Sequence, residues 1–451
     1  MLYLQQRFGG SMNYMRRLSA FQIIIIGFAG LVLAGTFLLM LPFATADEGS
    51  AGFWDALFTS VSATCVTGLV VHDTGTYWTF FGQAVILALI QVGGMGVVTI
   101  AIMIAVLSGK NITLMQRSTL QEAVSAPQLG GIVQMLKVIV QWTVILEGLG
   151  AVVMAPVFIQ EFGWIKGTWF ALFHSISAFC NAGFDLTGVL EPGSSLMFYA
   201  ENPVINATVM VLIIAGGLGF ITWADLLVNG LHFRKYRLQT KMILTATVGL
   251  ILLPALLFYS CDFSALPDGP RFWASLFQSV TARTAGYNTV DLNIMTEGGR
   301  MVLILLMMIG GSPGSTAGGI KSTTFFTLIA TAAATFRMKK DVECFGRRIA
   351  PTSIRHSLTV LLLYIGLLSL GSILITYIDG FPILDSAFES ASAIATVGLT
   401  VGVTASAGQV SRDVLMLLMF FGRVGGITLI YAMHKDFGNN YVRLPEEKIS
   451  I

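Results

Sequence analysis

The stretch FWDALFTSVSATCVTGLVV, residues 53–71, decides the fold, because three similar stretches recur later in the same chain. They read TWFALFHSISAFCNAGF (168–184), FWASLFQSVTARTAGY (272–287) and ILDSAFESASAIATVGL (383–399). In each copy a Phe is followed two residues on by a Ser, and a Gly stands near the end. Those glycines, Gly68, Gly183, Gly286 and Gly398, are 115, 103 and 112 residues apart. This period is too long for a solenoid and indicates a fourfold duplication of a whole membrane module.

The composition is that of a membrane protein. Hydrophobic residues make up 55% of the chain and charged residues only 11%, whereas soluble proteins are roughly a quarter charged. Mean hydropathy is +0.78. The four cysteines are far apart and form neither a metal-binding spacing nor a disulfide framework.

Long apolar runs flank each short stretch and are long enough to span a bilayer. They cover residues 21–43, 77–107, 132–158, 204–228, 242–259, 301–336, 358–378 and 414–433. Between two spans, a short stretch at membrane depth must be buried in protein or line a water-filled cavity. The predicted fold is therefore an all-α polytopic membrane protein. It has four pseudo-repeats of helix, re-entrant pore loop and helix around a central pore, with eight spanning helices. The repeats are predicted at 1–109, 110–231, 232–339 and 340–434, and a C-terminal tail at 435–451.

Charge predicts the orientation. Most of the 26 Lys and Arg residues lie in the N-terminal tail, the connections between repeats and the C-terminal tail. Most acids lie in the loops beside the short stretches, among them Asp73, Asp185 and Asp291. Because cytoplasmic loops carry the excess of basic residues, both termini are predicted to be cytoplasmic in the plasma membrane, with the pore loops entering from outside. An acidic outer vestibule would concentrate cations.

The residues around the four glycines predict a cation selectivity filter. Their side chains are small or uncharged, so the backbone is the main polar surface. Glycine adopts positive φ cheaply, which lets successive carbonyls point the same way. Four such strands around an axis make a ring of carbonyl oxygens that replaces the water around a dehydrated cation. The predicted filter consists of Val66, Thr67 and Gly68; Asn181, Ala182 and Gly183; Thr284, Ala285 and Gly286; and Thr396, Val397 and Gly398.

The second apolar run of repeat three contains MIGGSPGSTAGGIKST, residues 308–323, which has too much Gly and Pro to sustain a helix. The corresponding segments QVGGMGVVT and IAGGLGFIT of repeats one and two are expected to stay helical, so only one of the four equivalent helices is predicted to break. The break leaves a loop below the filter, which either gates the pore or is a kink without a gating role. A phosphate-binding loop is excluded, since Gly319 is followed by Ile320 and not by Lys.

Two cations are predicted at membrane depth, where charge is costly and usually faces a bundle interior or a cavity. They are Lys321, just after the broken stretch, and Arg423 in FGRVGG. Either they impede cations under the filter, or they only anchor loop carbonyls, and both roles are compatible. Two buried acids, Glu147 and Asp225, either couple transport to a proton or sodium or pair structurally, and we favour the structural role.

The motifs VTGL, NAGF, RTAGYN and TVGLT, in this order, resemble the Trk/Ktr/HKT superfamily of potassium transporters, most closely its Ktr-type membrane subunit. The resemblance covers nearly the whole chain. It implies potassium uptake, because a Gly in all four repeats accompanies potassium selectivity in that superfamily. It also implies that the protein is not an enzyme. It also implies that Arg283 braces the third filter strand, and that an intramembrane loop forms the gate, although Pro313 departs from the usual loop sequence. The implied gate residues are Gly310, Gly311, Ser312, Pro313, Gly314, Ser315, Thr316, Ala317, Gly318, Gly319, Lys321 and Arg423.

The same resemblance implies the partners. They are a second copy in a homodimer, a cytosolic ring of RCK-type regulatory subunits that carries ATP or ADP, and the surrounding membrane lipid, but no nucleic acid. The basic connections and the tail at Arg443-Leu444-Pro445 are candidate contacts with the ring. No cofactor is expected on this chain, and sodium activates some members of the superfamily.

Two other classes of membrane protein fit the sequence less well. A sodium-coupled or proton-coupled secondary cation transporter would show inverted halves with breaks in matching positions, whereas these four repeats share one orientation. An intramembrane enzyme would need a nucleophile with a base, or metal ligands, and the five histidines are scattered.

Overall fold

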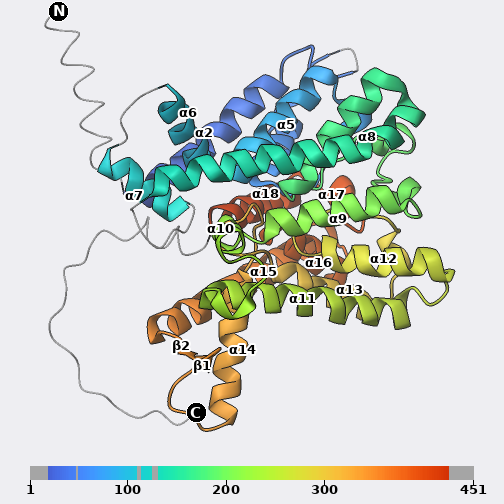
Figure 1. Cartoon of the computed structure of the whole chain (residues 1–451). Coiled ribbons are helices and arrows are strands. Elements are labelled where there is room, and N and C mark those ends of the chain that lie inside the picture. The colour runs from blue at the N-terminus through green and yellow to red at the C-terminus, as the bar shows by residue number, and fades with distance from the viewer. Residues whose placement is uncertain (1–18, 47–48, 109–112, 124–130, 426–451) are drawn as a thin grey trace, which may run out of the picture.

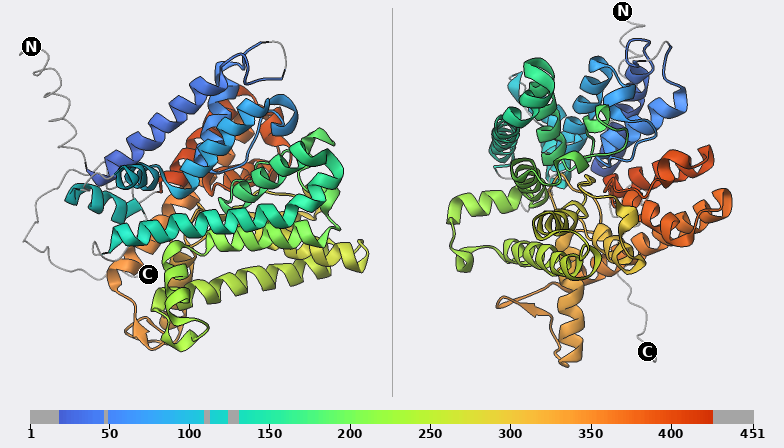
Figure 2. Two further views of the ribbon diagram at one scale, coloured as in Figure 1. Left: turned by 45° about the horizontal axis from the view of Figure 1, so that its top comes forward. Right: turned by 90° about the vertical axis from the view of Figure 1, so that its right-hand side faces the viewer.

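The computed structural model describes residues 19–46, 49–108, 113–123 and 131–425, which are mostly helical (Figure 1). The predicted C-terminal tail, the end of the last predicted helix and the basic residues before Ser19 lie outside the described residues. Within them, the strands β1 (Glu343–Cys344) and β2 (Arg347–Arg348) form an antiparallel hairpin after α14. The view from the end of the bundle shows helices of all four repeats, coloured from blue to red, around a common centre (Figure 2).

The first helix of each repeat is long and apolar enough to cross a membrane. These helices are α2 (Ala20–Leu39), α8 (Ile132–Phe179), α11 (Leu238–Leu257) and α15 (Pro351–Asp379). The backbone of α8 turns at Gly163, where φ is 76°, so one label covers both the first helix and the pore helix of repeat two. A π-helical turn, η4 (Phe258–Asp262), follows α11.

Each short stretch forms a pore helix, as predicted. They are α3 (Phe53–Cys65), the C-terminal part of α8, α12 (Asp268–Thr281) and α16 (Ile383–Ile394). In repeats one to three the repeated Ser attaches the pore helix to the first helix of its repeat: Ser60, Ser175 and Ser279 donate hydrogen bonds of 2.7, 2.6 and 2.6 Å to the carbonyls of Val32, Glu147 and Ile251. In repeat four the Ser390 hydroxyl is buried and has no hydrogen-bond partner among the described residues.

The second helices of repeats one and two correct the prediction. Repeat one has α5 (Phe80–Met95) and α6 (Val97–Leu107), and repeat two has α9 (Pro203–Gly217) and α10 (Phe220–Asn229). The two helices of each pair meet at bends of 91° and 97°. The prediction that only repeat three is broken is wrong, because Gly96 and Gly219 adopt φ of 88° and 84°, which ends a right-handed helix.

Repeat three is broken over a longer stretch, as predicted. It has α13 (Glu297–Met308), an irregular segment at 309–321 and α14 (Ser322–Phe336). Repeat four has α18 (Gln409–Val424). By length and composition, four helices of the described part can span a membrane, or six if each bent pair counts as one span. The eight predicted spans also include α18 and the interrupted pair of repeat three.

Short helices complete the connections. They are α4 (Thr74–Tyr77), α7 (Leu114–Ala123), η1 (Thr187–Val189), η2 (Met197–Tyr199), η3 (Phe233–Lys235), η5 (Leu292–Ile294) and α17 (Val403–Ser406).

Candidate ion pathway

Each of the four strands after the pore helices contains two residues with positive φ. The first is not a glycine: φ is 58° at Val66, 58° at Asn181, 69° at Thr284 and 52° at Thr396. The second is the repeated glycine two residues later, with φ of 91°, 68°, 85° and 96° in chain order. Left-handed backbone at a β-branched residue is rare and strained, and it persists only where the surroundings enforce it. Val66, Thr284 and Thr396 are β-branched, whereas Asn181 tolerates this region. The same left-handed backbone in all four repeats indicates a shared structural requirement.

The four glycines lie against one another in a closed cycle. A Cβ added to Gly68 would meet the carbonyl oxygen of Ala182 at 2.5 Å, and one added to Gly183 would meet that of Ala285 at 2.7 Å. The cycle continues from Gly286 to the carbonyl of Val397 and closes from Gly398 back to that of Thr67. The predicted filter residues of the four repeats, far apart in sequence, therefore meet around one centre. A side chain at any of the four glycines would press on the neighbouring strand.

Hydroxyl groups near the end of each pore helix hold the strands, and the sequence analysis missed them. The Gly68 N–H donates to Ser62 Oγ at 3.1 Å, and the Gly398 N–H to Ser392 Oγ at 3.0 Å. In repeats two and three the hydroxyls of Ser177 and Thr281 instead donate to carbonyls after the glycine, both at 2.8 Å. The signal was available, since a Ser or Thr stands two residues after the repeated Ser in every copy.

The segment after the fourth strand is held by a buried carboxylate. Glu389 on α16 accepts hydrogen bonds from the N–H of Val401 at 3.1 Å and from the hydroxyls of Thr400 and Thr404. After the second strand, Asp185 accepts from the hydroxyl of Thr187 at 2.7 Å. Burial raises the pKa of the Asp185 carboxyl to about 6.

The irregular segment 309–321, here called the intramembrane loop, contains the predicted gate residues 310–319. It is attached to repeat two by backbone hydrogen bonds at the bend between α9 and α10. The N–H of Ser312 donates to the carbonyl of Gly217 at 2.9 Å, and the N–H of Phe220 donates to that of Gly314 at 2.9 Å. The Thr316 hydroxyl donates to the carbonyl of Phe179, at the end of a pore helix, at 3.1 Å. The loop therefore contacts the segment where the second pore helix meets the strand predicted to form part of the filter.

Arg423 connects the loop to two other repeats. Its guanidinium, near the end of α18, donates to the carbonyls of Thr316 in the loop, Gly93 and Gly94, the last at 2.8 Å. Lys321 instead closes the loop on itself, with Nζ donating to the carbonyl of Ala317 at 2.7 Å. Both predicted intramembrane cations thus bind carbonyl oxygens, and neither has a carboxylate partner among the described residues.

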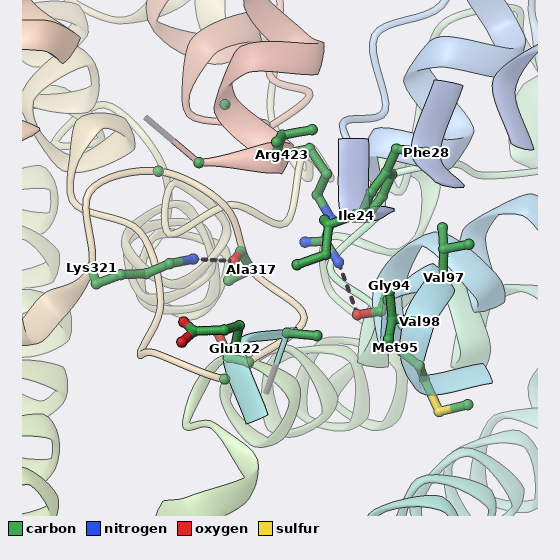
Figure 3. Close-up of a pocket in the computed structure, with 18 of the residues that line it drawn as sticks. Ile24, Phe28, Gly94, Met95, Val97, Val98, Glu122, Ala317, Lys321 and Arg423 are labelled. Atoms are coloured by element: carbon green, nitrogen blue, oxygen red, sulfur yellow. Dashed lines mark hydrogen bonds between the residues drawn. The ribbon is translucent and has the colours of Figure 1, made fainter. Parts of the chain in front are cut away.

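A cavity of about 360 Å³ lies beside the loop. Figure 3 shows Lys321 and Arg423 on opposite sides of Ala317, with Glu122 of α7 directed into the same space. The sequence analysis did not select Glu122, because it belongs to a connection between repeats and no motif marks it. The cavity also borders Gly96 and Gly425, so helices of repeats one and four meet at this space.

Of the other charged residues selected from the sequence, Glu147 and Asp225 have hydrogen-bond partners, whereas Arg283 Nε has none among the described residues. Arg283 is buried and lines a small cavity with Gly217 and Gly311, between the third strand and the loop. The Glu147 carboxylate accepts from the amide of Gln91 at 3.2 Å. Asp225 accepts from the side chain of Asn229 at 2.8 Å and from the backbone of Arg237 at 2.9 Å.

Fold and site together define an integral membrane protein built from four pseudo-repeats. The family described as TrkH, cation transport protein, matches residues 10–440. The chain belongs to this family. It is 38% identical to Ktr system potassium uptake protein B of Bacillus subtilis, over 95% of this chain and 96% of that protein. It is also 38% identical to the potassium/sodium uptake protein NtpJ of Enterococcus hirae, over 97% and 98% of the two chains.

The solved structure of the potassium transporter TrkH from Vibrio parahaemolyticus shares the fold. The two structures superpose with a TM-score of 0.72 at 20% identity, covering 92% of this chain and 84% of the other. The recognition of the superfamily from sequence motifs is confirmed, and so is the predicted class of fold.

Proposed function

We propose that this protein mediates potassium uptake through a channel-like pore, with the twelve filter residues as the selectivity filter. The observation that carries the proposal is the closed cycle of contacts among Gly68, Gly183, Gly286 and Gly398. The four adjoining strands carry uncharged side chains, so backbone carbonyls are the groups available to replace the hydration shell of a potassium ion. The pore helices point their C-terminal ends at the same centre, which favours a cation there. The printed names of the two relatives, one for potassium and one for potassium and sodium uptake, support an alkali cation.

The intramembrane loop is proposed as the gate. Its backbone is tied to repeat two, and Arg423 ties it to repeats one and four. A loop held by hydrogen bonds from several repeats responds when those repeats move relative to one another. The bends at Gly96 and Gly219 supply hinges next to its attachment points.

The orientation and partners are also proposed. The basic connections favour cytoplasmic termini in the plasma membrane, which puts the filter on the outer side of the loop. The chain would act as a homodimer regulated by a cytosolic RCK-type ring that binds ATP or ADP. The β1–β2 hairpin projects from the bundle beside α14 (Figure 1) and carries the exposed Arg347 and Arg348, which makes it a candidate contact with that ring.

Cation flux into proteoliposomes tests the proposed function, with potassium, rubidium and sodium compared for wild type and Gly68→Ser. Wild type should pass potassium and rubidium and exclude sodium. The variant should discriminate less, because a Cβ at Gly68 displaces the strand at Ala182 and Gly183. Equal sodium flux in wild type, unchanged by Gly68→Ser, would reject the filter and favour a sodium-coupled or proton-coupled transporter.

A further inference from the structure

Two adjoining cavities lie at one end of the bundle, beside helices α7, α8 and α10. The first, of about 550 Å³, lies between α8 and α10, and the second, of about 630 Å³, lies beside the start of α8 and α7. Gly131 and Gln134 line both, so the two spaces adjoin at the first turn of α8. Figure 1 shows α7, the start of α8 and α10 at the same end of the molecule.

The first cavity is apolar. Most of its lining comes from aliphatic and aromatic side chains, including Ile139, Trp142 and Trp223. Val228, at its edge, is 82% exposed, so the cavity reaches the outer surface of the bundle. An apolar space open to the surface of a membrane helix bundle is suited to an acyl chain rather than to a hydrated ion.

The second cavity, together with the margin of the first, is cationic. Arg117 and Lys137 line the second cavity, and Arg237 lines the first. All three side chains are exposed, and within the described part of the chain none forms an ion pair with a carboxylate. Basic pockets between membrane helices recognise anionic lipid head groups.

We propose that these two cavities form a binding site for an anionic phospholipid of the adjacent leaflet. The acyl chains would occupy the apolar cavity beside Trp142 and Trp223, and the phosphate would lie among Arg117, Lys137 and Arg237. Free phosphate would leave the apolar cavity unfilled, and a neutral lipid would leave three cations without a counter-charge. The site lies next to the bend between α9 and α10, where the intramembrane loop is attached. The proposal does not depend on which cation the pore conducts.

The test measures lipid binding to the purified full chain in detergent, by native mass spectrometry and by the shift of the unfolding temperature. Phosphatidylglycerol and phosphatidylcholine are the probes. Wild type should retain phosphatidylglycerol in preference to phosphatidylcholine. In the triple variant Arg117→Gln, Lys137→Gln and Arg237→Gln the apparent affinity for phosphatidylglycerol should fall about fivefold for each cation removed. Lys235→Gln, an exposed cation that lines neither cavity, is the matched control and should keep the preference.

A second variant, Ala224→Trp, fills the apolar cavity while the cations remain. It should lose retained phosphatidylglycerol although it elutes as a single folded species. The proposal is overturned by equal binding of the two lipids to wild type, or by equal effects of the triple variant and Lys235→Gln. It is also overturned if inorganic phosphate alone gives the full shift, or if Ala224→Trp changes the number of copies per particle without changing lipid retention.

Discussion

Arg423 shows how much depends on one side chain. Its guanidinium carries fixed donors in a planar fork, so one residue binds carbonyls of the intramembrane loop and of repeat one together. Those carbonyls have their partial negative charge directed at the arginine rather than at a passing ion. The residue therefore holds the loop in place, and it would also add a positive charge to the proposed ion path below the proposed filter.

Arg423→Gln should raise basal potassium flux about tenfold, since hydrogen bonds from a charged donor contribute roughly 1.5–3 kcal/mol each. The measurement is rubidium uptake into proteoliposomes without the regulatory partner. Arg337→Gln, which removes an exposed arginine at the end of α14, is the control and should leave flux unchanged. A flux equal to or below that of wild type would contradict the role of Arg423 in closing the loop.

Asp185 gives a prediction for pH. Because burial raises the pKa of this carboxyl to about 6, it is ionised above that pH and neutral below it. Because an ionised carboxylate at the pore mouth attracts cations, uptake should fall as external pH is lowered through about 6 and Asp185 becomes neutral. Asp185→Asn should reduce uptake at neutral pH by up to about fivefold and flatten the pH profile. Asp291→Asn, with another acid of the loops, is the control and should keep the wild-type pH profile. If wild type and Asp185→Asn show the same pH profile, the Asp185 carboxylate does not set the pH dependence of cation uptake.

The sequence predicted the glycines of the strands but not the strained residues before them. Glycine is favoured at positions that need positive φ, so the four repeated glycines allow a positive φ to be predicted at each of them. Val66 and Thr396 carry no such mark, because β-branched residues normally avoid that region. Only the packing of four strands around a common centre enforces it, and packing between distant segments cannot be read from local sequence.

Among the structural elements, the pore helices have two structural roles. In repeats one to three the repeated Ser attaches the pore helix to the first helix of its repeat. In all four repeats the last turn of the pore helix supplies a hydroxyl that holds the strand of the proposed filter. The strand is therefore positioned by a rigid helix rather than by the loop that follows it. Selectivity should then depend on these hydroxyls as well as on the glycines.

Ser62→Ala removes the acceptor for the Gly68 N–H and should lower the potassium-to-sodium flux ratio about fivefold, as expected for one buried hydrogen bond. Thr64→Val is the matched control, because the buried Thr64 hydroxyl on the same helix has no hydrogen-bond partner among the described residues. The control should keep the wild-type ratio. Equal losses in both variants would indicate general disturbance of α3, and no loss in either would show that the Ser62 hydroxyl does not position the strand.

Hydrophobic length identified the elements but not the bends. QVGGMGVVT and IAGGLGFIT are apolar throughout, and a glycine inside an apolar helix is ordinarily tolerated. The third glycine of each motif, Gly96 or Gly219, ends the helix because contacts with other segments fix the residues beside it. At Gly219, for example, the following residue Phe220 donates its N–H to the carbonyl of Gly314 in the loop. The bend is thus a consequence of the loop in repeat three, which no pattern within repeat two predicts.

At the scale of the whole molecule, one motif has been repeated four times and then modified unequally. All four copies keep the glycine and the positive φ two residues earlier. Among the described residues, repeat three alone has a long irregular segment in place of a sharp bend. Repeat two and Arg423 of repeat four hold this segment, and Arg423 also binds carbonyls of repeat one. We therefore propose that selectivity depends on the features that all four repeats share, and gating on the segment that distinguishes repeat three.

Anomalous scattering from crystals of the full chain soaked in thallium, a heavy substitute for potassium, tests whether the four strands form a cation site. We expect a peak at the centre enclosed by Gly68, Gly183, Gly286 and Gly398, which an excess of potassium removes and an excess of sodium does not. A peak beside the buried carboxylate of Glu147, with none at the centre of the four strands, would contradict it.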